Sequence, residues 1–133
     1  MAVTWNQEKM TTGVREIDAQ HKEWIRRYNE FDEAVVNRKG IEAIRSTLDF
    51  LGEYAETHFA DEERRMADAH LSILEQNRKE HNEFRSKLSE IKGWVMREGV
   101  SIVEVIALKS TLEDWMEDHI CTVDVKLRAI GQG

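Results

Sequence analysis

Several histidines and a glutamate in this sequence have the spacing needed to hold metal ions between helices. In THFADEE, at positions 57–63, His58 and Glu62 are four residues apart, so on a helix both project from one face. A buried carboxylate is costly unless it is paired with a cation. Imidazole is a common metal ligand, and a carboxylate can bridge two ions, so this pair indicates a metal site.

Four amphipathic segments must position these groups. In each, apolar residues recur at intervals of three or four, which is the spacing of a helix that faces a bundle core. The four series run from Ile17 to Val35, from Ile41 to Glu62, from Leu74 to Val95 and from Ile102 to His119. The chain has no proline, which favours long helices.

Short breaks at 37–40, 67–71 and 98–100 separate the segments, and short connections make neighbouring helices antiparallel. The sequence therefore predicts an all-α, up-down-up-down four-helix bundle with an N-terminal arm of about a dozen residues and a short C-terminal tail. Ser72 and Glu75 have the spacing of a capping box, which predicts that the third helix begins at Ser72.

Polar side chains interrupt all four apolar series at the same end of this bundle. They are His21, His58, Glu62, Asn77, His81 and His119. Taken singly, each has an ordinary interpretation: a histidine can be a hydrogen-bonded core residue, Glu62 can turn to solvent, and Asn77 can set the helix register. No lysine or arginine occurs in the four series, so the joint pattern favours bound metal. His70 is expected to be a solvated residue of the loop before the third helix.

The donor types narrow the class of metal site. Cys121 is the only cysteine, which excludes a thiolate site, and the cluster has more ligands than a closed structural zinc site needs. No Glu-x-x-His motif of the ferritin-like carboxylate proteins occurs. A histidine-rich centre with few carboxylates belongs to another class.

Four motifs resemble the signatures of the bacterial hemerythrins over nearly the whole chain. They are DAQHK at 18–22, HFADEE at 58–63, KEH at 79–81, and His119-Ile120 followed by Asp124. The resemblance implies a four-helix bundle that holds two iron ions with a bridging oxo or hydroxo group and takes O2 as a ligand. The ligands that it implies are His21, His58, Glu62, His81, His119 and Asp124, with Glu62 and Asp124 as bridges.

Two positions depart from these patterns. Asp124 lies five residues after His119, off a simple helical face, so we expect the helix to distort or end there. Asn77 stands where the resemblance implies a seventh ligand, a histidine, so each iron would keep two histidines. We expect a more symmetric, wetter and more easily oxidised centre, with water or the Asn77 carbonyl oxygen in the vacancy, or with incomplete iron occupancy.

The residues that flank these positions resemble the family's O2 pocket, and they are also expected to pack the core. They are Trp24, Phe59, Trp115, Met116 and Ile120. The resemblance therefore implies an O2-binding protein for storage, transport or sensing. The alternative is a di-iron oxidase, a peroxidase-like enzyme or an enzyme that handles nitric oxide; iron storage is a weaker third interpretation.

Composition limits the other possibilities. The 133 residues carry a net charge of −7 with no basic patch, which makes nucleic acid an unexpected partner. No apolar run approaches the roughly 20 residues of a membrane span, and the N-terminus lacks the apolar core of a signal peptide. A lone cysteine fits a reducing compartment. We expect a single hemerythrin-like domain over 1–133, located in the cytoplasm. The sequence does not identify a protein partner.

Overall fold

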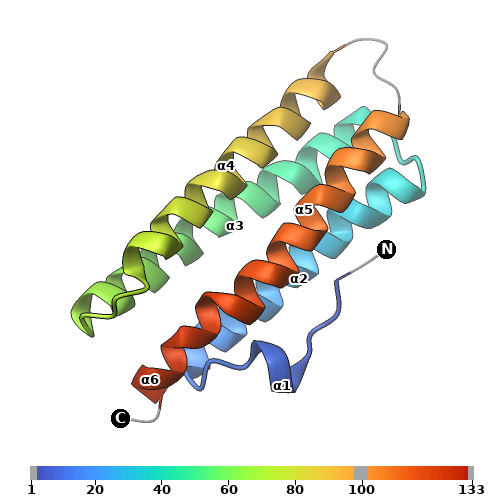
Figure 1. Ribbon diagram of the computed structural model, residues 1–133. Helices are drawn as coiled ribbons and strands as arrows, with labels where there is room; N and C mark the ends of the chain where they lie inside the picture. Colours follow the sequence, from blue (N-terminus) through green and yellow to red (C-terminus); the bar gives the residue numbers. More distant parts are fainter. Residues whose placement is uncertain (1–2, 98–101, 132–133) are drawn as a thin grey trace.

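Four long helices form the molecule, and the prediction of an all-α bundle is confirmed. The computed structural model describes residues 3–97 and 102–131, and this part of the chain contains no strand. The long helices are α2 (Arg15–Val36), α3 (Ile41–Asp68), α4 (Leu74–Met96) and α5 (Ile102–Thr122). They run alternately up and down (Figure 1), with α2 and α4 each packed against both α3 and α5. The predicted break at 98–100 lies outside the described residues.

The connection after α3 follows from local backbone chemistry. His70 adopts a positive φ of 54°, a conformation that ends many helices. The next residue, Leu71, then donates its N–H back to the carbonyl of Met66 at 3.0 Å. His70 itself is exposed, as the sequence predicted.

The predicted capping box at the start of the third long helix is wrong. The helix begins at Leu74, and its N-cap is Ile73, without a side-chain hydrogen bond. Apolar packing sets this boundary instead. The half-buried side chains that lead into α4 pack on a buried apolar cluster, Val14, Ile17, Met66 and Leu127.

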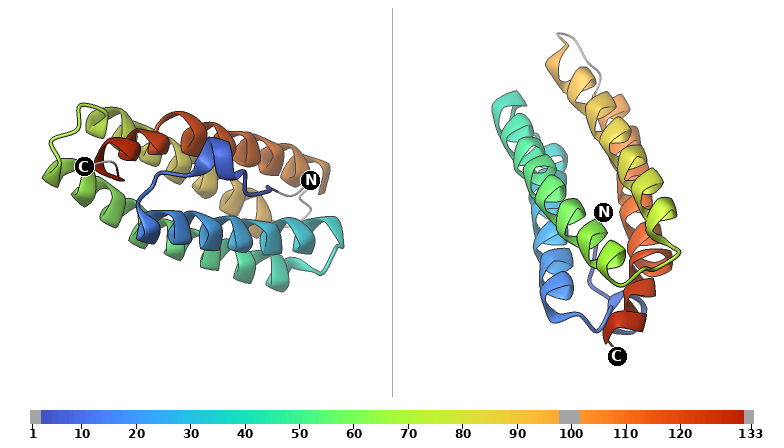
Figure 2. Two further views of the ribbon diagram at one scale, coloured as in Figure 1. Left: turned by 90° about the horizontal axis from the view of Figure 1, so that it is seen from below. Right: turned by 90° about the vertical axis from the view of Figure 1, so that its left-hand side faces the viewer.

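Both ends of the chain close over the bundle. The arm contains one helical turn, α1 (Gln7–Met10), and the tail forms a 3-10 helix, η1 (Asp124–Leu127), followed by α6 (Arg128–Gly131). The arm crosses the face between α2 and α5 (Figure 2). It is fastened to the tail by Arg128, which donates to the carbonyls of Glu8 and Thr11 at 2.8 Å each. The arm and the short tail were both predicted.

A lysine lies buried in the core, which the sequence pattern did not indicate. Lys109 in α5 is only 2% exposed and forms ion pairs with Asp32 and, at 3.7 Å, with Glu113. The Tyr28 hydroxyl donates to Glu113 at 2.9 Å. The apolar series passes on either side of Lys109, so its burial is not visible in that pattern. Because its partners are these acids, Lys109 does not neutralise Glu62.

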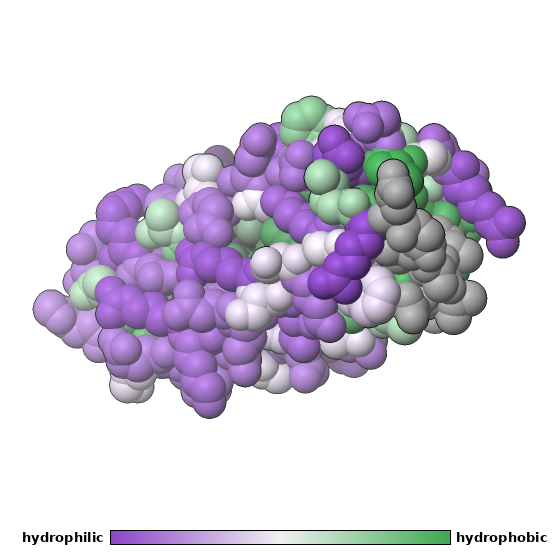
Figure 3. All heavy atoms as spheres, turned by 90° about the horizontal axis from the view of Figure 1, so that it is seen from above, coloured by the Kyte–Doolittle hydropathy of each residue, from purple (hydrophilic) through white to green (hydrophobic). Residues whose placement is uncertain are grey.

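The outer surface is mainly hydrophilic in the view from above (Figure 3), with apolar side chains gathered toward one end. The large apolar residues that are exposed are Val36, Ile41, Phe50, Met96 and Ile106. None of the helices in the described ranges combines the length and the apolar composition that a membrane span requires.

Candidate metal centre

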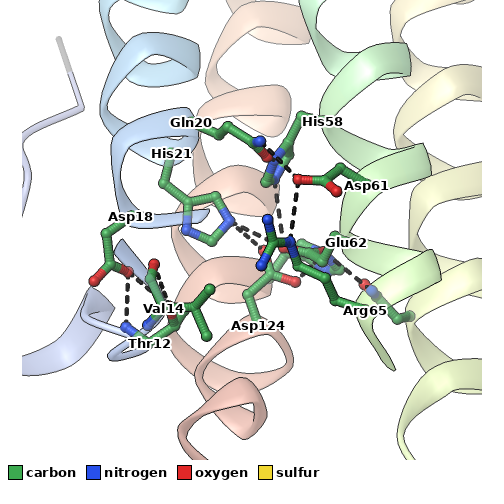
Figure 4. Close-up of polar contacts among 12 residues, drawn as sticks. Thr12, Val14, Asp18, Gln20, His21, His58, Asp61, Glu62, Arg65 and Asp124 are labelled. Carbon is green, nitrogen blue, oxygen red and sulfur yellow. Dashed lines mark hydrogen bonds and ion pairs between the residues drawn. The ribbon is translucent and has the colours of Figure 1, made fainter. Parts of the chain in front are cut away.

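The structure brings the six predicted ligands together inside one end of the bundle. They are His21 from α2, His58 and Glu62 from α3, His81 from α4, His119 from α5 and Asp124 from η1. All six are buried. Figure 4 shows His21, Glu62 and Asp124 facing one another below the ring of His58.

These side chains form two groups of four, and within each group the potential ligand atoms lie within 4.8 Å of one another. The first group is His21, His58, Glu62 and Asp124, and the second is His81, His119, Glu62 and Asp124. Each group has two imidazoles, and both share the same two carboxylates. The cluster can therefore offer two nitrogens and a shared pair of carboxylates to each of two ions.

Glu62 lies between the two pairs of histidines. Its Oε2 is 3.2 Å from Nε2 of His21 and 3.4 Å from Nε2 of His58. Its Oε1 is 3.1 Å from Nε2 of His81 and 4.0 Å from Nε2 of His119. One carboxylate oxygen thus faces each pair, which is the arrangement that a bridging carboxylate requires.

Asp124 reaches the cluster because the long helix ends just before it. Helix α5 stops at Thr122, and the chain tightens into η1 from Asp124 onward, so the expected break is present. The Asp124 oxygens then lie 2.9 Å from His21 Nε2 and 3.0 Å from His119 Nε2. Like Glu62, Asp124 presents one oxygen to each group.

Several buried polar atoms of the cluster have no hydrogen-bond partner among the described residues. They are Nε2 of His58 and of His119, both carboxylate oxygens of Asp124, and Oδ1 of Asn77. The close contacts of Asp124 do not have hydrogen-bond geometry. Such atoms are costly to bury unless something binds them. Ligands about 2.1 Å from an ion and at right angles are about 3 Å apart, close to these separations, so the residues fit bound metal ions.

Carboxylates outside the cluster orient two of the rings. His81 Nδ1 is 2.7 Å from Glu63, and His119 Nδ1 is 2.8 Å from Glu80. A carboxylate only accepts hydrogen bonds, so Nδ1 of each ring keeps its proton. Nε2, which faces Glu62, is then the nitrogen left for a metal.

Gln20 orients the ring of His58. Its Nε2 donates to Asp61 at 2.8 Å, and because Asp61 only accepts, this contact fixes the orientation of the amide (Figure 4). The amide oxygen therefore faces His58 Nδ1 at 2.8 Å, and Nδ1 must donate. His58 Nε2 is again the nitrogen that faces the cluster.

Sequence reasoning missed these orienting residues. Gln20 precedes His21, Glu63 follows Glu62 and Glu80 precedes His81, so each stands beside a predicted ligand in a motif. Yet each bonds a histidine of another helix. Adjacency was the only available signal, and the partner could be found only from the packed helices.

Charges inside the cluster shift the pKa values strongly in the ion-free protein. Burial alone lowers the pKa of His21 and of His119, but Asp124 and Glu62 outweigh burial and raise these pKa values to about 9 and about 10. Burial lowers the pKa of His58 to about 3. Burial acts to raise the pKa of Asp124, but His119 and His21 hold it well below its usual range. Protons on two imidazoles therefore balance two buried carboxylates, and a metal ion must displace them.

Asn77 is buried beside the second group. Its Nδ2 donates to Glu62 Oε1 at 3.0 Å and lies 3.2 Å from the sulfur of Met66. Its Oδ1 is among the atoms without a partner. A turn of the amide would present that oxygen to the cluster. A wetter centre stays a prediction, although the thioether of Met66 makes one wall of this position apolar.

Aromatic rings cover the inner side of the cluster. Phe59 stacks on His81 with ring centroids 3.7 Å apart, and Trp115 stacks on His119 at 4.6 Å. Of the five predicted pocket residues, Trp115 is half-buried and the others are fully buried: Trp24, Phe59, Met116 and Ile120. Their packing role is present, and their role as an O2 pocket stays a prediction.

Known proteins resemble this chain over most of its length. The profile of the hemerythrin HHE cation binding domain matches residues 12–127. Two curated relatives are each 30% identical to this chain over 114 residues. They are proteins named bacteriohemerythrin from Pseudomonas aeruginosa and from Pseudomonas paraeruginosa. These matches cover 86% of this chain and 72% of each relative.

Proposed function

Because the chain belongs to the hemerythrin family, we propose that it is a non-haem di-iron protein that binds O2 for storage, transport or sensing. The observation that carries the proposal is the pair of four-residue groups that share two buried carboxylates. A site for a single ion would need only one such group of ligands. The buried atoms without hydrogen bonds support the same conclusion.

The proposal gives each side chain a role. Glu62 and Asp124 would hold both ions, and the histidines would bind them through Nε2. When bound, the pair of ferrous ions supplies the electrons for reversible O2 binding. Phe59 and Trp24 are fully buried beside the rings and exclude water, which would otherwise promote release of the reduced oxygen as peroxide.

Asn77 makes the two ions alike in their number of histidines. We propose that the Asn77 oxygen or a water completes the coordination near His81, and that oxidation in air is faster than with a histidine there. The variant Asn77→His tests this. It should slow air oxidation of the iron-loaded protein and change the absorption spectrum. An unchanged spectrum and an unchanged oxidation rate would show that Asn77 has no such role.

A second candidate function is enzymatic, and Asn77 is the observation that favours it. A di-iron oxidase, a peroxidase-like enzyme or a protein that handles nitric oxide needs a coordination position that its substrate can reach. The missing histidine would leave such a position where a displaceable water, rather than the Asn77 oxygen, fills it. Stopped-flow absorption of the reduced, iron-loaded protein distinguishes the two functions. An absorption band that appears with O2 and disappears when O2 is removed supports binding, whereas consumption of O2 or peroxide over many turnovers supports an enzyme.

A further inference from the structure

We infer that hydrogen bonds outside the cluster make the two metal positions unequal, so that the ion held by His81 and His119 binds more tightly than the ion held by His21 and His58. This inference rests on the proposed function, because it assumes that both groups bind metal. It goes further by ranking two sites that have the same number of histidine and carboxylate donors. Glu63 and Glu80 act as positioning residues that strengthen one site.

The second group has an anionic partner behind each imidazole. Glu63 accepts from His81 at 2.7 Å, and Glu80 accepts from His119 at 2.8 Å. These carboxylates are about one-fifth exposed, at 21% and 18%, so solvent screens them only in part. A carboxylate behind a ligating imidazole raises the basicity of the ring and holds its orientation.

The imidazoles of the first group have no anionic partner at Nδ1 among the described residues. His58 donates to the amide oxygen of Gln20, which carries no charge. Nδ1 of His21 is buried and has no hydrogen-bond partner among the described residues. Neither ring gains the basicity that a carboxylate partner gives, and His21 is not held by a hydrogen bond at Nδ1.

More distant charges do not cancel this difference. Gln20 bonds Asp61 on its far side, and Asp61 is itself paired with Arg64 and with Arg65, the latter at 3.2 Å. On the other side, Glu63 forms a looser ion pair with Arg78 at 3.4 Å and a weaker electrostatic interaction with Arg85, which is itself paired with Glu56. The amide of Gln76 donates to Glu80 and brings no charge. The second group therefore retains more negative charge close to its histidines.

The two carboxylates behind His81 and His119 compensate for the histidine that Asn77 replaces. Asn77 lies on the His81 side, so the group that lacks the family's extra histidine is the one with two carboxylates behind its rings. Each outer partner of this kind typically changes metal affinity by about 10–100-fold. Stronger imidazole donors can thus offset the missing ligand.

Titration of the ion-free protein with Co²⁺ against a chelating indicator tests the ranking. Two binding steps are expected, with the first at least about tenfold tighter. Glu63→Gln and Glu80→Gln keep a hydrogen-bond acceptor but remove the charge. Each should weaken binding at the His81–His119 position by about 10–100-fold, which closes or reverses the gap between the two steps, and should leave the affinity of the His21–His58 position nearly unchanged. The matched control is Glu56→Gln on the same helix as Glu63, because Glu56 bonds Arg85 at 2.8 Å rather than a histidine.

NMR at one equivalent of Co²⁺ shows which position fills first. The hyperfine-shifted, exchangeable Nδ1 protons should be those of His81 and His119, and Glu80→Gln should move one of them. The opposite change, which adds a negative charge behind the first group, is the double variant Gln20→Glu with Asp61→Asn. It gives His58 a carboxylate as its Nδ1 partner, and the amide at position 61 donates to that carboxylate. It should tighten the second step and narrow the gap.

Equal affinities in the unmodified protein would overturn the ranking while leaving two bound ions, and hence the proposed function, intact. First occupancy at His21 and His58 would also overturn it, as would equal effects of Glu63→Gln and Glu56→Gln. A folded protein that binds no Co²⁺ would overturn the proposed function as well.

Discussion

Metal binding should expel protons from the cluster, and the number expelled should depend on pH in a defined way. In the ion-free protein, the carboxylates of Asp124 and Glu62 outweigh burial and raise the pKa of His21 to about 9 and that of His119 to about 10. Both rings therefore carry an extra proton at neutral pH. Each must lose it before Nε2 can bind a metal ion.

The expected magnitude follows from these two pKa values. At pH 7.5 both rings are almost fully protonated, so loading should release about two protons from them. At pH 9.5 His21 is mostly neutral while His119 is mostly charged, so the release should fall to about one. His58, whose pKa burial lowers to about 3, releases none in this range.

Calorimetry in buffers of different ionisation enthalpy measures the release, with the metal supplied as a weak chelate to keep it dissolved at the higher pH. Long-range ¹H–¹⁵N spectra of the ion-free protein check independently that the His21 and His119 rings are charged. A water ligand that ionises would release more protons as the pH rises, which is the opposite trend. Release that stays constant or increases between pH 7.5 and 9.5 would refute the reasoning.

Two further outcomes are expected. The folded-state pKa values of His21 and His119 lie above the ordinary 6.5, so the stability that these two rings contribute is complete below pH 6.5 and is lost as the pH rises through 9–10. Urea unfolding of the ion-free protein should therefore give a lower free energy of unfolding at pH 10 than at pH 7. An equal or higher free energy of unfolding at pH 10 would contradict this. Lys109→Met should lower the free energy of unfolding by about 3 kcal/mol, because Asp32 and Glu113 lose a buried cation. A decrease of less than about 1 kcal/mol in the same assay would show that these ion pairs contribute little to stability.

Helical periodicity predicted much of the fold and of the cluster. The spacing of His58 and Glu62 on one helix, and the position of His81 near the start of another, are enough to place them at one end of an antiparallel bundle. Such residues lie where the regular helix puts them, so sequence distance translates directly into position. The capping prediction at Ser72 failed because apolar packing, rather than a side-chain cap, decides where α4 begins.

Other features depend on departures from the regular helix or on contacts between helices. Asp124 joins the cluster through the 3-10 turn after α5, and only the resemblance to a family pointed to it. Glu80 orients His119 from a neighbouring helix, and Lys109 is buried because Asp32 lies opposite it. The spacing of residues within one helix does not predict contacts between helices, so these pairs could be found only in the packed structure.

One cluster of side chains is proposed to hold both iron ions. Iron analysis and X-ray absorption of the protein, reconstituted with Fe²⁺ without air, test it most directly. Two irons per chain are predicted, with an iron–iron scattering contribution at no more than about 4 Å. A folded protein that retains one iron, or two without such a contribution, would contradict the shared carboxylates of Glu62 and Asp124 as bridges.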